Sequence, residues 1–502
     1  MAVALAAKVT GRAVRAVLER GEDIQRSGQR GEFHASWRAA LTAGRITGVE
    51  LKLLKNAGWN IGCSPDILTR CLIASSNCYQ WETMLATGDT VRTNTPSNTA
   101  FRAYGSPPAF AITENMIFDI CAEHNLDPIE FRRKHFRKIG DITHYGQELR
   151  EDDCTVEECF DECIEKSNYY SQLKAVEDWN REHKHRKRGI SLLPFSYGVG
   201  GALGQAGALL NVHLDGSVVI SIGGVELGQG LFTKMAQVAS HELGAPLDCI
   251  TVAESSTERV PNPNLTGGSS TADYCGGAVR DACLQLNARL APVKASQPEI
   301  GWKGWVFVAW NNKINLSVAG HFTARKEWSN YDKDHKKGNK FTYFVSGAAC
   351  CTVEVDTLTG EHRLLSAHVV MDIGESLNPA IDIGQIEGAF MQGYGYLCME
   401  DTLFSEQGHL LSAGHDTYTI PSIKDLPPIF KVSLLRKPTP VENRRVLYSS
   451  KGVGEPPFLA GETAFFAIKA SVLAARVEQG KKGGGNLEAP ATPFNVLAAI
   501  GR

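Results

Sequence analysis

The alternation of hydrophobic and polar positions in the first part of the chain predicts strands followed by helices. Residues 35–58 read as strand, turn and strand, with breaks at Gly44 and Gly48. Residues 110–137 carry apolar side chains at helical spacing and are interrupted at Asp127-Pro128, where two helices should meet. This part of the chain is therefore expected to combine a small sheet with helices.

The part of the chain after residue 206 repeats an order of hairpin and helix. Residues 207–230 predict a hairpin that turns at Asp215-Gly216, and the helix that follows should end at Gly244. Residues 350–374 predict another hairpin, with its turn at Thr359-Gly360, and a helix follows it as well. Strands and helices in this order predict a fold that contains both, an α/β fold in the broad sense. Its sheets are expected to be mixed and packed with helices, as in the α+β class.

One carboxylate lies in a constrained turn, "SSKGVGEPP" at 449–457. Gly452 and Gly454 permit left-handed backbone, and the proline after Glu455 disfavours helical geometry at that glutamate. Residues 461–476 then read as a helix. The pattern predicts a strand, a turn and a helix, with Glu455 in the turn, although a lone Gly-Glu-Pro is more often a surface acid after a glycine turn.

Several loops are rich in glycine and contain amide, hydroxyl or guanidinium side chains. Their backbone donors, hydroxyls and amides are groups that can surround an anion. None of them matches the phosphate-binding loop or the dinucleotide-binding fingerprint. Together they indicate a large polar anionic cofactor that is held by backbone and amides. The loops are 99–108 with Arg102, 224–231 with Gln229, 264–273 with Ser269, and 383–393 with Gln385 and Gln392.

The length of 502 residues predicts two or more domains. The expected division is a first domain over 1–150, a charged helical linker over 151–190 and a second domain over 191–502. A basic run at 181–189 falls at the boundary, and such a run is more often a solvated helix or linker than a phosphate site.

Charge and cysteine usage narrow the class of protein. The net charge of −3 gives no reason to expect nucleic acid or a membrane as partner, and no apolar run is expected to reach transmembrane length. Lys8 and Arg12 interrupt the N-terminal apolar stretch, which argues against a signal peptide. The 13 cysteines, an odd number, favour reduced thiols and a cytoplasmic protein. Cys154, Cys159 and Cys163 lack a standard metal-binding spacing and read as thiols on a helix.

Four motifs taken together resemble the molybdenum hydroxylases, the family of xanthine dehydrogenase and aldehyde oxidase. The motifs are "SNTAFRAYG", "GGVELGQGLFTKMAQVAS", "LNPAIDIGQIEGAFMQG" and "SSKGVGEPP". The resemblance runs in order over nearly the whole chain and corresponds to the later part of the molybdopterin-binding region, with two subdomains. It implies molybdenum-molybdopterin as cofactor. Iron–sulfur clusters and FAD are expected only in a full-length enzyme, because no motif for either is found in this sequence.

The resemblance also assigns roles to the loop residues. Glu455 matches the catalytic base of a hydroxylation in which water supplies the oxygen. Arg102 and Gly268 match positions around the molybdenum. The positions that match the cofactor site are Gly228, Gln229, Gly268, Ser269, Thr271, Gln385 and Gly454.

At the substrate-binding positions, some residues match those of the family and others differ from them. Arg70 matches an arginine that orients purines, although it also reads as a helix-surface residue, and Tyr104 matches a phenylalanine that stacks on the substrate ring. Gly198 and Val199 stand where the family has a second stacking phenylalanine and a threonine, which predicts a wider and less polar pocket. Pro108 replaces a glutamine of the family. Purines such as hypoxanthine and xanthine, other N-heterocycles and aldehydes all stay open as substrates.

The family further implies a cytoplasmic homodimer, with purine catabolism as one role. Two other interpretations stay open. The chain is also compatible with a non-catalytic or truncated paralogue without the iron–sulfur and flavin domains. A carboxylate-dependent hydrolase would need a second acid beside Glu455, and the sequence identifies none.

Overall fold

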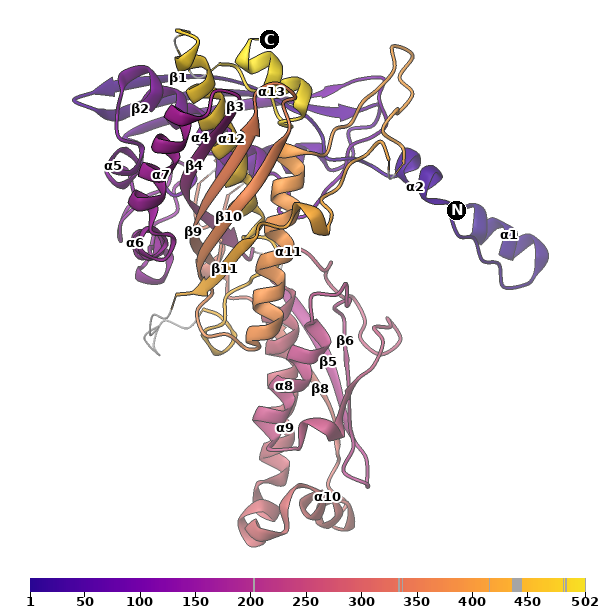
Figure 1. Cartoon of the computed structure of the whole chain (residues 1–502). Helices are drawn as coiled ribbons and strands as arrows, with labels where there is room; N and C mark the ends of the chain where they lie inside the picture. Colours follow the sequence, from indigo (N-terminus) through magenta and orange to yellow (C-terminus); the bar gives the residue numbers. More distant parts are fainter. Residues whose placement is uncertain are drawn as a thin grey trace.

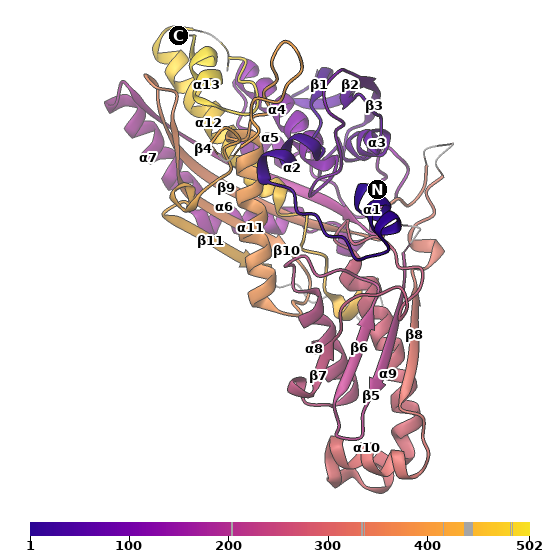
Figure 2. The ribbon, with the colours of Figure 1, turned by 90° about the vertical axis from the view of Figure 1, so that its right-hand side faces the viewer.

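The computed structural model of the chain has an upper body that contains two sheets and an elongated lower lobe that contains a third (Figures 1 and 2). Helix α11 (Pro379–Cys398) runs from the upper body toward the lower lobe. The structure describes residues 1–201, 204–332, 335, 337–414, 416–435, 445–481, 483 and 485–501.

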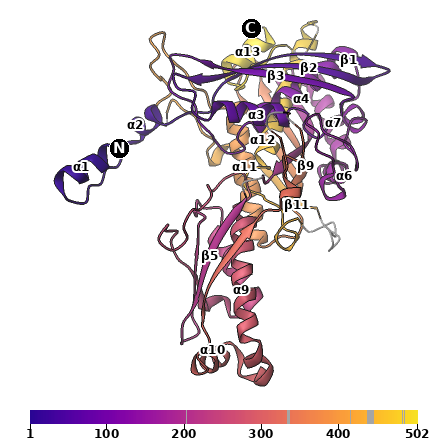
Figure 3. The ribbon, with the colours of Figure 1, turned by 180° about the vertical axis from the view of Figure 1, so that it is seen from behind.

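The N-terminal part forms a three-stranded sheet across the top of the upper body (Figure 3). Two helices precede the sheet and protrude from the body, and α3 and α4 pack on its inner face. The predicted strand pair and the helix break at Asp127-Pro128 are confirmed, but the break expected at Gly48 is wrong, because Gly48 lies inside β2. The elements are α1 (Ala2–Thr10), α2 (Arg20–Arg26), β1 (Phe33–Thr42), β2 (Arg45–Gly58), α3 (Ser64–Ala74), β3 (Thr83–Arg92), α4 (Ser106–His124) and α5 (Pro128–Arg133).

The central sheet has the strand order β11-β10-β9-β4 and is covered on both faces. Cys350 and Cys351 are neighbours on β9, yet they belong to different cores because side chains alternate along a strand. Cys351 packs on the side of α12, and Cys350 packs on the side of α6. The elements are α6 (Val156–Ser167), α7 (Tyr169–Glu182), β4 (Arg186–Val199), β9 (Tyr343–Asp356), β10 (His362–Asp372), β11 (Ile429–Leu434), α12 (Phe458–Glu478) and α13 (Pro493–Ile500).

Most of the segment 151–190 is helical, in α6 and α7, and it packs on the central sheet, but its last residues already belong to strand β4, so the expectation of a helical linker up to residue 190 is wrong there. Cys159 and Cys163 of α6 are fully buried in the core beneath β9 and β10. The basic run is not solvated throughout, because Lys187, the second residue of β4, has its side chain 2% exposed and its Nζ 3.0 Å from Glu478. The expectation of a solvated run is therefore wrong at Lys187. The domain limits themselves stay a prediction.

The lower lobe is a four-stranded sheet, in the order β7-β6-β5-β8, with helices on one side. The first predicted hairpin turns at Gly216, whose φ is 88°, and α8 ends at Gly244, whose φ is 70°. Both positions are left-handed, which explains the glycines. The elements are β5 (Gln205–Val212), β6 (Val218–Ile222), α8 (Leu231–Leu243), β7 (Ile250–Val252), α9 (Thr271–Ser296), α10 (Gly301–Asn311) and β8 (Ser317–Thr323).

Helix α12 lies in the middle of the upper body. Among the described residues it is long and apolar enough to cross a membrane by length and composition, so the expectation that no run reaches that length is wrong. Most of the helix is buried, with Phe466 and Ile468 at 0% exposure. Its apolar composition is accounted for by packing against the central sheet and α11.

The backbone that leads to Glu455 differs from the predicted strand. Residues 447–449 form a short 3₁₀ turn, and Tyr448 and Ser449 have φ values of 48° and 61°. Such left-handed residues break an extended chain, and only Ser450 forms a bridge, to Gly374. The helix after Glu455 is confirmed as α12.

Candidate functional site

The loop before α8 is held by its own polar side chains. Glu226 accepts hydrogen bonds from the backbone N–H of Gly228, Gly230 and Phe232 at 2.9–3.0 Å, so it caps the helix. Burial alone would raise the pKa of Glu226, but these backbone donors hold its pKa below the usual value. The amide of Gln229 turns back on the loop and donates to the Val225 carbonyl at 2.9 Å. Glu226 was not predicted as a functional residue.

The loop before α9 lies directly against the turn that carries Glu455. Gly268 and Ser269 are both left-handed, with φ values of 65° and 61°. The Ser269 hydroxyl accepts a hydrogen bond from the backbone N–H of Glu455 at 2.8 Å. A Cβ on Gly452 would lie 2.3 Å from the Ser269 carbonyl oxygen, so this approach requires a glycine at position 452. Thr271 begins α9 at the same place.

Arg102 joins the same turn to α11. Its Nε donates to the Gly454 carbonyl at 2.6 Å. Its two terminal nitrogens donate to the side-chain oxygens of Gln392 at 3.0 Å and Gln385 at 3.1 Å. Burial lowers the pKa of Arg102, and the nearby Glu455 carboxylate opposes that shift. One cation therefore connects the first part of the chain, the helix and the turn.

These loops enclose one cavity of about 480 Å³, which is lined by residues of both the upper body and the lower lobe. Cofactor-sized ligands occupy clefts of about 300–1,000 Å³. All residues predicted as catalytic, cofactor-binding or metal-environment residues line it, although their roles stay predictions. They are Arg102, Gly228, Gln229, Gly268, Ser269, Thr271, Gln385, Gly454 and Glu455.

The three predicted substrate residues do not line this cavity. Arg70 is half-buried beside it, Val199 is buried at 1% exposure, and Tyr104 is half-buried in a left-handed turn with φ 57°. Burial, with smaller contributions from Cys63 and Asp66, raises the pKa of Tyr104 to about 12.

The prediction of a wider pocket at Gly198 is wrong. A Cβ at Gly198 would lie 2.2 Å from a ring carbon of Phe341, so that ring fills the space beside the glycine. Phe341 is 44 or more positions away from every predicted site residue, and no local pattern identifies it. Tyr197, the neighbour of Gly198, was also missed, and its hydroxyl donates to Oε2 of Glu455.

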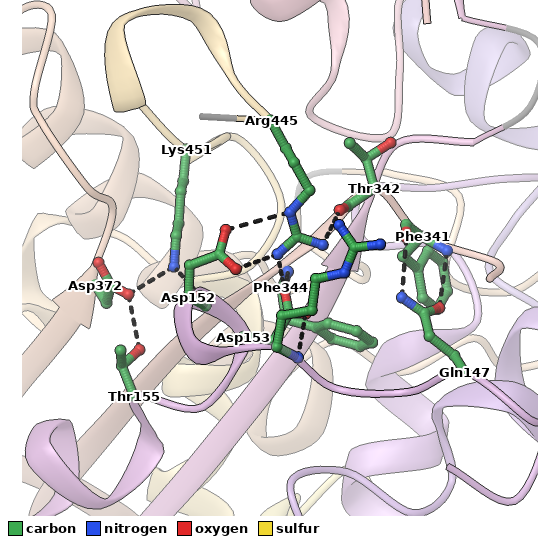
Figure 4. A network of polar contacts seen from close by, with 11 residues as sticks. Gln147, Asp152, Asp153, Thr155, Phe341, Thr342, Phe344, Asp372, Arg445 and Lys451 are labelled. Carbon is green, nitrogen blue, oxygen red and sulfur yellow. Dashed lines mark hydrogen bonds and ion pairs between the residues drawn. The ribbon is translucent and has the colours of Figure 1, made fainter. Parts of the chain in front are cut away.

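Two buried ion pairs lie at the wall of the cavity. Lys451 Nζ is 2.6 Å from Asp372 and also donates to the Asp152 carbonyl at 2.8 Å (Figure 4). Lys234 Nζ is 2.5 Å from Asp382. Burial would raise the pKa of Asp372, but Lys451 together with Thr155 and the Gly374 N–H holds it below the usual value. Both lysines line the cavity, and neither was predicted as a site residue from the sequence.

Asp273 links the start of α9 to the turn through a tyrosine. The Tyr343 hydroxyl donates to Asp273 at 2.8 Å and accepts from the Gly452 N–H at 2.8 Å. Burial raises the pKa of Asp273 to about 7, and it outweighs the opposite influence of Tyr343 and Lys234. A carboxyl that lines the cavity therefore changes charge near neutral pH.

We expect Asp273→Asn to remove part of the pH dependence of stability. The folded pKa of about 7 lies above the unfolded value of about 3.9, so the folded chain binds more protons between them. The free energy of unfolding should then fall as pH rises through this window and level off above it. Urea denaturation from about pH 4 to about pH 8 measures the slope for wild type and variant. The exposed control Asp248→Asn should keep the slope, and an unchanged slope in Asp273→Asn would contradict the assignment.

The donor set of the cavity suits a large anionic group. Arg102 supplies positive charge, whereas Lys234 and Lys451 are each paired with an aspartate, and the left-handed loop 268–269 brings backbone close to the cavity. Among the residues that the structure describes, no group of three or more His, Cys, Asp or Glu side chains could hold a metal ion.

Comparison with known proteins agrees with this geometry. Two sequence profiles described as molybdopterin cofactor-binding domain match residues 1–136 and 162–427. Xanthine dehydrogenase of Calliphora vicina is 43% identical over 502 residues, and aldehyde oxidase 1 of Macaca fascicularis is 43% identical over 500. Each alignment covers 99% of this chain and 37% of the relative. The chain thus spans little more than a third of the length of these curated relatives.

Solved structures share the fold. The aldehyde oxidoreductase of Desulfovibrio desulfuricans matches with a TM-score of 0.84 and 25% identity, over 99% of this chain and 52% of that one. Quinoline 2-oxidoreductase of Pseudomonas putida matches with a TM-score of 0.85 and 20% identity, over 99% of this chain and 66% of that one. The α/β architecture with mixed sheets is therefore confirmed.

Proposed function

This chain belongs to the molybdopterin cofactor-binding domain family, and from that premise we propose that it is the hydroxylation module of a molybdenum-dependent oxidoreductase. Its substrates would be purines such as hypoxanthine or xanthine, other N-heterocycles, or aldehydes, with water as the oxygen source. The relatives named xanthine dehydrogenase and aldehyde oxidase support both substrate classes equally, at 43% identity each.

Molybdenum-molybdopterin fits the cavity by charge and by backbone geometry. Bound there, it supplies a two-electron redox centre. Arg102 and Gln385 offer donors from one side, and the loops at Gly228–Gln229 and Gly268–Ser269 offer backbone and amide groups from the other. The turn at Gly454 closes the cavity beside Arg102.

The observation that carries the proposal is the fixing of Glu455 at three points on the cavity wall. Its backbone N–H is bound by Ser269, the preceding carbonyl is bound by Arg102, and its Oε2 accepts a hydrogen bond from Tyr197. Its Oε1 is left to take a proton during the reaction. A general base has to be held within hydrogen-bond reach of the proton that it removes, and this arrangement provides that constraint.

The proposal also covers the oligomeric state, the location and the remaining cofactors of the whole protein. We propose a homodimeric, cytoplasmic enzyme of purine or aldehyde oxidation, in which iron–sulfur clusters and FAD belong to other parts of a longer protein. The 37% share of the curated relatives that the chain covers supports only the further parts of a longer protein, whereas the homodimer and the location follow from the family resemblance alone.

The test is molybdenum content and turnover of the purified chain. Hypoxanthine and benzaldehyde are supplied separately, each with NAD or with an artificial electron acceptor. We expect bound molybdenum and turnover with the artificial acceptor, without sustained NAD reduction, because electrons must leave the centre through a relay in a longer protein. Sustained NAD reduction would contradict the module assignment. Absence of both metal and turnover would favour the non-catalytic interpretation.

A further inference from the structure

Tyr197 connects the catalytic turn to the central sheet. It lies near the end of β4, is 2% exposed, and donates a hydrogen bond to Oε2 of Glu455. Burial and the neighbouring Glu455 charge raise the pKa of Tyr197 far above its usual value. The phenol therefore keeps its proton, so the hydroxyl acts as the donor and the carboxylate as the acceptor.

Arg70 fixes the ring of Tyr197. Its guanidinium carbon is 4.4 Å from the ring centroid of Tyr197 and 4.4 Å from that of Phe341. The same group donates to the Ser106 hydroxyl at 2.9 Å and to the Gly198 carbonyl at 2.8 Å. A planar cation that is stacked on two rings and hydrogen-bonded at its Nε and at one terminal nitrogen has little freedom to reorient toward a ligand.

The opposite ring of this stack is anchored by its backbone. Gln147 accepts from the Phe341 N–H at 3.0 Å and donates to the Phe341 carbonyl at 2.9 Å (Figure 4). The next residue, Thr342, pairs with the Val199 carbonyl at 2.8 Å and accepts from Arg445 at 2.6 Å. The stack is therefore attached to β4, to the start of β9 and to the segment that leads to Glu455.

From these contacts we infer that Tyr197 is a positioning residue for Glu455, and that Arg70 supports Tyr197 instead of contacting substrate. The inference rests on the proposed function, in which Glu455 accepts a proton. It changes the assignment of Arg70, which resemblance alone gives as a purine-orienting residue. Because the support is independent of the substrate, its loss should slow the oxidation of purines and aldehydes alike.

The first test is Tyr197→Phe in the holoenzyme with an artificial electron acceptor. Loss of one hydrogen bond to a charged group should lower kcat about 10- to 100-fold for both hypoxanthine and benzaldehyde. KM should change less than about threefold, and molybdenum content should match wild type, because Tyr197 binds neither substrate nor cofactor. The matched control is Tyr79→Phe, which removes a buried 2.6 Å bond to Glu114 in another core and should keep kcat.

The second test separates support from substrate binding at Arg70. Arg70→Lys keeps the charge but loses the planar stack, so kcat should fall for both substrates with KM unchanged. Tyr197→Phe combined with Arg70→Lys should be no slower than the slower single variant, because both act through one contact. A raised KM for hypoxanthine alone, with kcat retained, would overturn the inference and assign Arg70 to substrate.

The third test does not depend on turnover. In the chain labelled with ¹³Cζ-tyrosine, the resonance that disappears in Tyr197→Phe is that of Tyr197. This resonance should shift in Glu455→Gln and in Arg70→Lys, because it reports the hydroxyl and the ring environment. If the Tyr197 resonance shifts in neither variant, the inference is overturned. If it shifts in both variants but the chain binds no molybdenum and shows no turnover, only the proposed function is refuted. Thermal unfolding of Tyr197→Phe checks that the fold is kept, and Glu455→Gln probes the same contact with Tyr197 intact.

Discussion

Replacing Glu455 with glutamine should lower kcat by a factor on the order of 10²–10⁴ and leave the fold intact, because the amide cannot take a proton. The backbone N–H still donates to Ser269, and the side-chain carbonyl can still accept from Tyr197. Only the acid–base function is removed. Steady-state kinetics of the molybdenum-loaded enzyme measure the loss, and thermal unfolding checks the fold.

The control for this substitution is Glu123→Gln, an exposed glutamate on α4. It makes the same chemical change at a distance from the cavity and should keep kcat. If Glu455→Gln retained activity within a few-fold of wild type at full molybdenum content, Glu455 would not be the base. Lost molybdenum in the variant would instead show that Glu455 supports the cofactor.

Local patterns predicted the elements that carry the site. The turn at Asp215-Gly216 and the helix end at Gly244 both require left-handed backbone. Glycine favours this conformation, and glycines can be identified directly in a sequence. The glycine at 452 has a different role: its backbone is not left-handed, but the Ser269 carbonyl leaves no room for a side chain. The loop with Gln229 could be recognised for the same reason, because Gly228 and Gly230 are left-handed, whereas beside Arg102 the left-handed residues are Ala103 and Tyr104.

The walls of the site could not be predicted in this way. Phe341 fills the space beside Gly198 from a segment that is more than 140 positions away in the chain, so the effect of the glycine could not be read from its neighbours. The expected strand before Glu455 failed because Tyr448 and Ser449 adopt left-handed backbone, which their residue types do not signal. Lys187 appeared to be part of a solvated run, and only the fold shows that it pairs with Glu478.

The Lys451–Asp372 pair should be the largest single stabilising contact of the turn that carries Glu455. Both side chains are about 5–6% exposed, and they are 2.6 Å apart. The carboxylate also accepts from Thr155 at 2.7 Å, so the pair joins the turn to the end of β10 and the start of α6 (Figure 4). Lys451→Met would leave Asp372 buried without a countercharge.

We expect Lys451→Met to lower the free energy of unfolding by roughly 3–5 kcal/mol, the usual cost of removing one partner of a buried ion pair. Urea denaturation at neutral pH measures this change. The control Lys431→Met, at an exposed position on edge strand β11, should stay within about 0.5 kcal/mol of wild type. Adding Asp372→Leu to Lys451→Met should restore part of the stability, because no charge is then left buried. If Lys451→Met were as stable as wild type, the pair would not hold the turn, and the position of Glu455 would depend on Ser269, Arg102 and Tyr197 alone.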